Sequence, residues 1–104
     1  MAEALVMING RVQSWERTYH IFPSQWELKL YDGRFVYVRY RHGSLGFGVG
    51  SSPDDAVQNY ALLSISIHGE GRAYLADSEM IDALRKIGLD FQGATRVGFP
   101  DETP

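Results

Sequence analysis

The chain has no cysteine, so it can form neither disulfide bonds nor zinc sites built from thiolates, and it cannot use a thiolate nucleophile. The absence favours a reducing compartment. Nothing in the chain approaches the length of a membrane span, and the apolar run at residues 5–8 lacks the basic leader of a signal peptide. We therefore expect a cytoplasmic protein without a membrane partner.

A strong excess of charge of one sign is also missing. The 104 residues carry 10 Lys and Arg against 13 Asp and Glu, for a net charge of −3. Residues 1–50 hold six basic and four acidic side chains, a net of +2, and residues 51–104 hold four and nine, a net of −5. This balance is too mild to indicate a nucleic-acid binder or an acidic mimic of nucleic acid.

The length suits one domain, and a hydrophobic fraction of 44% argues against global disorder. The pattern predicts an α+β fold whose antiparallel sheet is curled or barrel-like. A β-meander is expected over residues 26–49, a short helix near 53–60 and a C-terminal helix over 78–87. Residues 1–92 would form the domain, and residues 93–104, which are polar and contain proline, would be partly frayed.

The meander is predicted from alternation and from two turns. In residues 26–30 and 44–49, apolar side chains alternate with polar ones or with glycine, and residues 34–41 form a longer β-rich run. Asp32-Gly33 and the dipeptide at 42–43 provide the turns between these runs. Because side chains alternate between the faces of a strand, the lengths of the turns decide which side chains share a face.

A two-residue first turn would divide the apolar side chains between both faces of the sheet. A three-residue turn over residues 31–33, with Gly33 in the left-handed region and a bulge, instead pairs Leu28 with Val36 and keeps them on one face. Combined with a two-residue second turn, it produces one continuous apolar face, and we predict this register. The face comprises Trp26, Leu28, Leu30, Val36, Val38, Tyr40, Leu45, Phe47 and Val49.

Two further hairpins are predicted, one before the meander and one after it. Asn9-Gly10 is a strong signal for a two-residue hairpin turn. The glycines at 69 and 71 mark the turn of the second hairpin. The corresponding elements are strands at 5–8, 11–15, 62–68 and 72–75, with a proline-containing turn at 22–25.

Both helices are predicted from the residues at their ends. Ser52 would cap the first helix, with Pro53 at the first helical position. Asp77 or Ser78 would cap the second helix, and Gly88 would end it. The side chains expected to face the core are Ala56, Val57 and Tyr60, then Met80, Ile81, Leu84 and Ile87, and finally Leu89 and Phe91.

The predicted register leaves a second face on the meander, where aromatic rings lie beside arginines. Glycines at 46 and 48 would leave Tyr37 and Arg39 accessible. Such a mixture is typical of protein interfaces and of platforms that stack single-stranded nucleic acid. The alternative is that the rings lie over the glycines and stabilise the sheet, or that another element covers the face. The candidate binding residues are Lys29, Phe35, Tyr37, Arg39 and Arg41.

Other patterns are weaker. His68 and Glu70 flank a glycine and could form half of a metal site, but no second pair at ligand spacing accompanies them. The glycines of residues 46–50 precede a helix start, yet the Walker lysine is missing and Asp54 and Asp55 would repel a phosphate. No nucleophile–base pair can be assigned. We therefore predict no metal, no cofactor and no catalytic residue.

These observations favour a small non-enzymatic domain that binds a macromolecular partner, by preference a protein, through the aromatic and arginine face. An accessory or regulatory role of bacterial or bacteriophage type is expected, and a homo-oligomer is compatible with it. Two alternatives are left open. One is a single-stranded nucleic-acid binder that uses the same face. The other is a small enzyme with His20 or His68 beside a carboxylate in a polar cleft.

Overall fold

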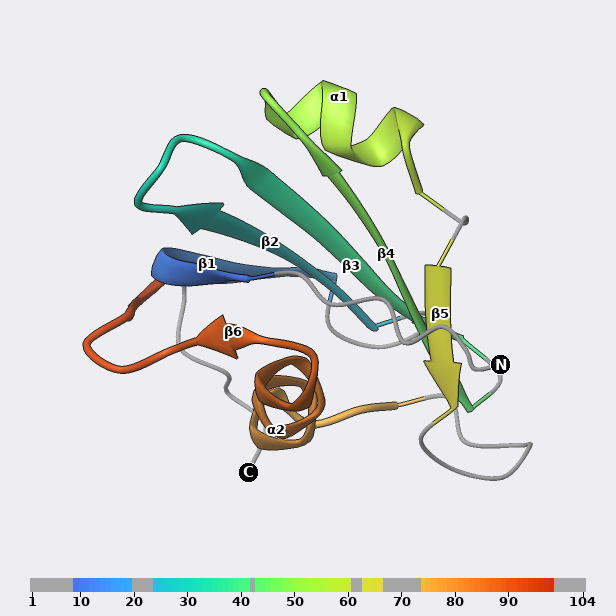
Figure 1. Ribbon diagram of the computed structural model, residues 1–104. Coiled ribbons are helices and arrows are strands. Elements are labelled where there is room, and N and C mark those ends of the chain that lie inside the picture. Colours follow the sequence, from blue (N-terminus) through green and yellow to red (C-terminus); the bar gives the residue numbers. More distant parts are fainter. Residues whose placement is uncertain (1–8, 20–23, 42, 61–62, 67–73, 99–104) are drawn as a thin grey trace, which may run out of the picture.

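The computed structural model describes residues 9–19, 24–41, 43–60, 63–66 and 74–98. These residues form a mixed α+β fold with one curled sheet and two helices (Figure 1), so the predicted fold class is confirmed. The helices are α1 (Pro53–Gln58) and α2 (Asp77–Lys86). The strands are β1 (Gly10–Tyr19), β2 (Ser24–Leu30), β3 (Phe35–Arg41), β4 (Ser44–Gly50), β5 (Leu63–Ser66), β6 (Leu89–Asp90) and β7 (Thr95–Val97).

Strands β2, β3 and β4 form the predicted meander, and its register is confirmed. Leu28 lies opposite Val36, as the three-residue first turn requires. In that turn the N–H of Gly33 donates to the carbonyl oxygen of Leu30 over 3.1 Å, and Gly33 has a φ of 97°, which glycine adopts without steric cost. Every residue of the predicted apolar face is buried, apart from Val49, which is half-buried against the same core.

Strand β1 continues the sheet beyond β2 and is bent by two bulges. It pairs antiparallel with β2, with one extra residue on β1 between Val12 and Ser14 and another after Arg17. A bulge increases the twist of a strand and shifts its alternation by one residue. Val12, Trp15 and Arg17 are therefore all buried on the core side, whereas Glu16 points to the other side.

Strand β1 also pairs with the C-terminal part of the described chain. β6 pairs parallel with residues 10–11, and β7 pairs parallel with residues 14–16. The full strand order is β5-β4-β3-β2-β1-β6, with β7 as a second partner of β1. The segment from residue 93 onward, expected to be partly frayed, thus contributes a strand to the sheet. Residues 99–104 lie outside the described part of the chain.

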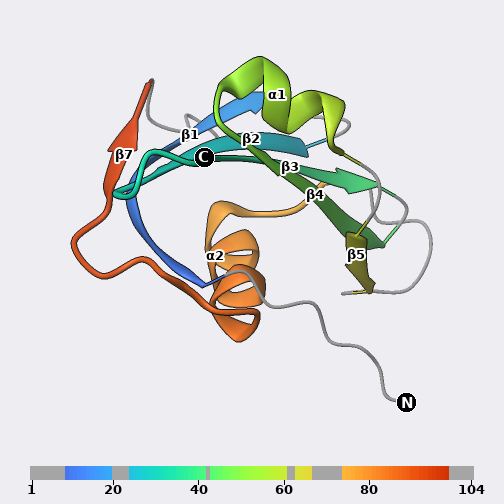
Figure 2. The ribbon, with the colours of Figure 1, turned by 45° about the horizontal axis from the view of Figure 1, so that its top comes forward.

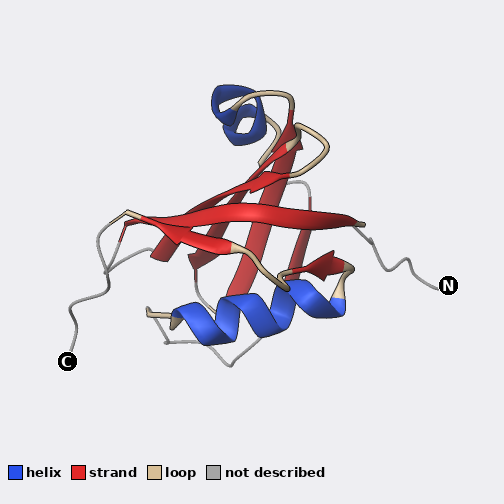
Figure 3. Ribbon diagram, turned by 90° about the vertical axis from the view of Figure 1, so that its left-hand side faces the viewer, coloured by secondary structure: helices blue, strands red, loops and turns tan. Residues whose placement is uncertain are grey.

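The two helices lie on opposite faces of the sheet (Figures 2 and 3). The curled sheet wraps around α2, which adds Met80, Ala83 and Leu84 to the core on the inner face. Helix α1 lies across β3 and β4 on the outer face. Within the described residues, no helix is long and apolar enough to cross a membrane.

Helix α1 begins as predicted, but fewer of its side chains face the sheet than expected. The Ser52 hydroxyl oxygen accepts a hydrogen bond of 3.1 Å from the Asp55 N–H, and Pro53 opens the helix. Ala56 is fully buried, whereas Val57, which was predicted to face the core, is 45% exposed. That prediction is wrong because consecutive positions of a helix point in different directions, and Ala56 occupies the one that meets the sheet.

Helix α2 ends as predicted, at Gly88 with a φ of 114°, but its start differs. The capping residue is Ala76, whose N–H donates to the Glu79 carboxylate over 3.0 Å. Asp77 is the first residue of the helix and does not cap it. The prediction of Asp77 or Ser78 as the cap is wrong because the Asp77 carboxylate binds side chains of the sheet instead, as described below.

The flanking hairpins were predicted less well than the meander. Gly10 is the first residue of β1 and lacks the positive φ of a type I′ turn, so the predicted Asn9-Gly10 turn is wrong. Its position is set by pairing with Leu89 instead. Strand β5 confirms the first strand of the second hairpin, whereas Tyr74 and Leu75 lie outside any strand. Ser24 and Gln25, predicted as the end of the turn at 22–25, are the first residues of β2, because they pair with β3. The predictions for residues 5–8, 22–23 and 67–73 fall outside the described residues.

Candidate functional site

All five candidate residues lie on the outer face of the sheet, and helix α1 covers one side of that face. Gly48 and Gly50 lie directly under the helix. A Cβ atom at Gly50 would come within 2.6 Å of the Ala56 nitrogen, and one at Gly48 would overlap the Ala56 carbonyl oxygen. The absence of side chains at these positions therefore lets α1 pack on the backbone of β4. This contact accounts for the glycine pattern without a phosphate site.

Tyr60 follows α1 and extends this cover over Tyr37. The two rings meet edge to face, with 5.3 Å between their centroids and 76° between their planes. Tyr37 is only 9% exposed, and burial raises the pKa of its phenol group. The guanidinium carbon of Arg39 lies 5.9 Å from the centroid of the Tyr60 ring. The expectation that Tyr37 is accessible is therefore wrong, because another element covers it.

The other three candidates lie at opposite ends of the outer face. Lys29 and Phe35 are cross-strand neighbours on β2 and β3, and the Lys29 ammonium lies 6.0 Å from the centroid of the Phe35 ring. Arg41 is exposed at the far end of β3, about 20 Å from Phe35 along an extended strand. The structure thus brings Lys29 and Phe35 together and separates them from Arg41.

Lys29 and Phe35 border a hollow of about 140 Å³ on the outer face, beside the part that α1 covers. Strands β1, β2, β3 and β7 all contribute to its lining. Phe35 is half-buried and Val97 is 43% exposed, so apolar surface is accessible here. We call the outward-facing lining residues the open face; they are Ser14, Glu16, Glu27, Lys29, Phe35 and Val97.

Two carboxylates lie side by side in the open face. Glu16 on β1 is directly opposite Glu27 on β2 in the register of the two strands. Burial raises the pKa of Glu27, and the charges of Glu16 and Asp54 raise it further. Among the described residues, neither glutamate makes a side-chain hydrogen bond or an ion pair. Like charges opposite each other destabilise a sheet, so a cation bound between them would relieve the repulsion.

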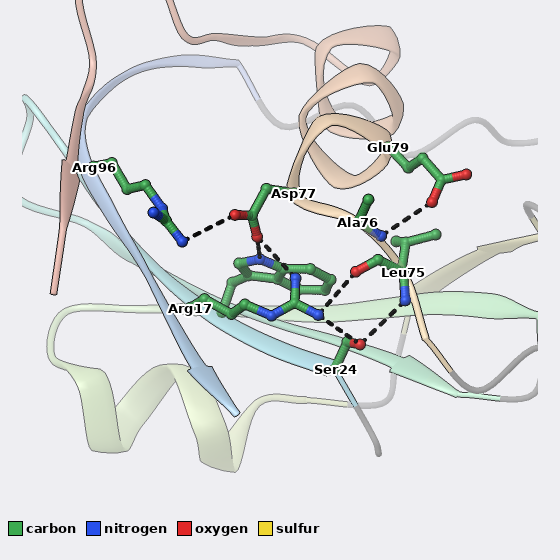
Figure 4. A network of polar contacts seen from close by, with 8 residues as sticks. Arg17, Ser24, Leu75, Ala76, Asp77, Glu79 and Arg96 are labelled. Carbon is green, nitrogen blue, oxygen red and sulfur yellow. Dashed lines mark hydrogen bonds and ion pairs between the residues drawn. The ribbon is translucent and has the colours of Figure 1, made fainter. Parts of the chain in front are cut away.

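A second polar cluster lies on the inner face and was not predicted (Figure 4). Its centre is Arg17, whose side chain is 1% exposed. The guanidinium donates to the Asp77 carboxylate at 2.8 Å, to the Ser24 hydroxyl oxygen at 3.0 Å and to the Leu75 carbonyl oxygen at 2.9 Å. It also lies 4.8 Å from the centroid of the Trp26 ring. These contacts tie β1 and β2 to the start of α2.

Asp77 extends the cluster to β7. It accepts a hydrogen bond of 2.9 Å from the indole N–H of Trp26, and its other oxygen lies 3.1 Å from the guanidinium of Arg96. Arg96 in turn lies over the Trp15 ring, with 5.4 Å between its guanidinium carbon and the ring centroid. Because Arg17 is buried and the charges of the cluster meet partners within the protein, we assign it to the fold. The sequence does place an acidic residue at the start of the predicted helix, but the partners of that residue depend on tertiary contacts.

The described residues contain no group of three or more His, Cys, Asp or Glu side chains placed to hold a metal ion. His20, His42, His68 and Glu70, on which the metal and enzyme hypotheses depended, lie outside the described residues. Comparisons with protein-family models, with curated proteins and with solved structures found no match. The geometry of the open face therefore carries the functional argument.

Proposed function

We propose that this protein is a protein-interaction domain that binds its partner through the open face. One observation carries the proposal: helix α1 covers β4 and Tyr60 covers Tyr37, but a lined hollow is left over β1 to β3, where apolar, basic and acidic side chains meet. The cysteine-free composition supports a cytoplasmic setting for this interaction.

The composition and size of the open face support a protein as the partner. Phe35 and Val97 offer apolar contact, and charged side chains surround them, as in the core and rim of many interfaces. A volume of about 140 Å³ is below the roughly 300–1,000 Å³ of sites for drug-sized ligands. A hollow of this size suits the end of one side chain from a larger partner.

The same geometry weakens the nucleic-acid alternative. A stacking platform needs accessible aromatic rings and a groove of positive charge. Tyr37 is covered by Tyr60, and Arg39 lies beside the same ring. Glu16 and Glu27 would repel the phosphates of a bound strand.

The proposal can be tested by selecting binders from a library of random linear peptides displayed on phage. We expect enriched peptides to bind the wild type and to lose about tenfold or more in affinity with Phe35→Ala, because aromatic anchors dominate interfaces. Val97→Ser, at an exposed position of the same face, should lose severalfold. Val57→Ala removes a similar apolar group that is 45% exposed on α1 and should bind unchanged.

The spectra and thermal midpoints of the variants establish that each is folded. Peptides that bind Phe35→Ala and Val97→Ser as well as the wild type would overturn the proposal, and so would a failure to enrich any peptide. A parallel titration with a single-stranded oligonucleotide at low and high salt addresses the alternative. We expect no salt-sensitive binding, and such binding, if lost in Lys29→Met, would favour a nucleic-acid partner.

A further inference from the structure

Building on the proposed function, we infer that the open face receives an arginine side chain of the partner protein, with its guanidinium group held between Glu16 and Glu27. The strand register holds the two carboxylates opposite each other on β1 and β2. Directly opposed residues of an antiparallel pair have Cβ atoms about 4.5–5.5 Å apart. Both carboxylates can therefore reach one cation, and the sheet keeps them from moving apart.

Charge complementarity identifies the occupant as a cation. No described residue forms a hydrogen bond or an ion pair with either carboxylate. Asp54 of α1 adds a third negative charge that acts on Glu27. The site thus carries negative charge for which the described part of the chain supplies no counter-charge in contact, and a cationic group of the partner would supply it.

The walls of the hollow favour arginine among cations. A guanidinium is planar, is weakly hydrated, stacks on aromatic rings and can donate to two carboxylates at once. Phe35 supplies a ring in the same hollow, and Val97 supplies aliphatic surface for the methylene chain. A hydrated metal ion would gain nothing from these apolar walls, and a volume of about 140 Å³ is below the roughly 300–1,000 Å³ of sites that enclose drug-sized ligands.

Lys29 is a cation that belongs to the open face itself, so its removal should affect cationic and anionic ligands in opposite ways. Its ammonium lies 6.0 Å from the centroid of the Phe35 ring, and it forms no ion pair with Glu16 or Glu27. It would repel an incoming guanidinium and compete for the same ring. Removing this charge should therefore strengthen the binding of arginine, whereas it would weaken the binding of a nucleic acid or of an acidic peptide.

The experiment is a titration of the ¹⁵N-labelled full chain with N-acetyl-arginine amide, followed by NMR. The matched control ligand is N-acetyl-citrulline amide, which has the same shape without the charge. We expect saturable shifts of the backbone amides of residues 14–16, 27–29 and 35 with the arginine compound alone. Binding should weaken at high salt, because the carboxylates are partly exposed.

The variants should change the affinity for the arginine compound in opposite directions. Glu16→Gln and Glu27→Gln should each weaken binding about fivefold, by loss of a charge-assisted hydrogen bond. Lys29→Met should strengthen it about threefold. Asp82→Asn, whose side chain is 68% exposed on α2, should leave it unchanged. N-acetyl-lysine amide should bind more weakly than the arginine compound, because an ammonium cannot donate in the same planar fork.

Equal shifts with citrulline, equal effects of Asp82→Asn and Glu27→Gln, or weaker binding in Lys29→Met would each overturn the inference. Its failure is distinguishable from failure of the proposed function. Selected peptides that depend on Phe35 but contain no arginine would leave the proposed function standing and remove the inference. Arginine binding at Glu16 and Glu27 without any selectable peptide would remove the proposed function and leave an arginine site without a protein partner.

Discussion

Arg17 joins three segments of the chain through one guanidinium group. It is buried on β1, and its partners come from β2, from the residue before the α2 cap and from α2 itself. A buried ion pair adds little over a well-packed apolar pair, but losing one partner leaves a charge without compensation. The cluster therefore stabilises the arrangement mainly by making other arrangements costly.

We expect Asp77→Asn to lower the free energy of unfolding by about 3 kcal/mol, because Arg17 and Arg96 lose their counter-charge. The matched control is Asp82→Asn, which breaks an exposed pair with Lys86 at 3.7 Å and should cost less than about 0.5 kcal/mol. Urea unfolding of both variants measures the difference. Equal losses would show that the Arg17 cluster is no more important than a surface pair.

Glu27 should make stability depend on pH. Its pKa in the folded protein is raised above the usual 4.5, mainly by burial and then by Glu16 and Asp54. The folded state therefore binds this proton more tightly than the unfolded state does. The stability that the bound proton provides is present below pH 4.5 and is lost as the pH rises through the raised pKa.

We therefore expect Glu27→Gln to be more stable than the wild type at about pH 7, and equally stable at about pH 3, where Glu27 is protonated in both states. The gain should stay below about 1 kcal/mol because solvent screens a half-buried group. Urea unfolding at both pH values checks this. A difference in stability between Glu27→Gln and the wild type that is the same at both pH values would contradict the role of the Glu27 charge.

At the scale of elements, the contact between α1 and β4 depends on glycine. We expect Gly48→Ala to lower the free energy of unfolding by about 2 kcal/mol, because its methyl group would meet the backbone of Ala56. Gly46→Ala meets only the end of the Tyr60 side chain, which can move, and should cost clearly less. Urea unfolding ranks the two variants, and the reverse order would contradict this account of how α1 is placed.

The meander could be predicted from the sequence because its information is local. The turn residues allow two registers, and the alternation of apolar side chains selects the one that gathers them on a single face. Gly33 adopts the positive φ that the three-residue turn required, and Leu28 lies opposite Val36 as a result. The start of α1 at Ser52 and Pro53 is equally local, since a cap bonds to a group three residues away.

What could not be predicted depends on residues far apart in the chain. The bulges of β1 have no sequence signature, yet they decide that Arg17 faces the core while Glu16 faces outward. Thr95–Val97 forms a strand by pairing with β1, and that pairing joins segments about 80 residues apart in the chain. For the site, Lys29 and Phe35 could be assigned to one face, but the cover of Tyr37 by Tyr60 and the pairing of Glu16 with Glu27 could not be foreseen.

At the scale of the whole molecule, β1 is the strand on which most of the sheet depends. It pairs with β2 along its length and with β6 and β7 on its other edge. Helix α1, in contrast, has six residues and packs mainly on β3 and β4. A helix this short is unstable without its packing surface, so it can open without disturbing the rest of the sheet.

Native-state hydrogen exchange should therefore separate the two regions. We expect the hydrogen-bonded amides of β1 and β2 to exchange with the free energy of global unfolding, and those of α1 to exchange through a local opening of lower free energy. Low concentrations of urea should speed exchange in β1 and β2 more strongly than in α1, because global unfolding exposes more surface than a local opening. Equal free energies of exchange in α1 and β1 would show that the molecule opens only as one unit.

The two parallel partners of β1 also bear on how the protein is made. The ribosome delivers residues 10–16 early, but their second edge is completed by residues 89–90 and 95–97. Until those residues emerge, the nascent chain carries an unpaired strand edge, which is a template for pairing with other chains. Synthesis is therefore a period in which this edge is exposed to pairing with other chains, and a chain released before residue 95 would lack the partner strand of residues 14–16.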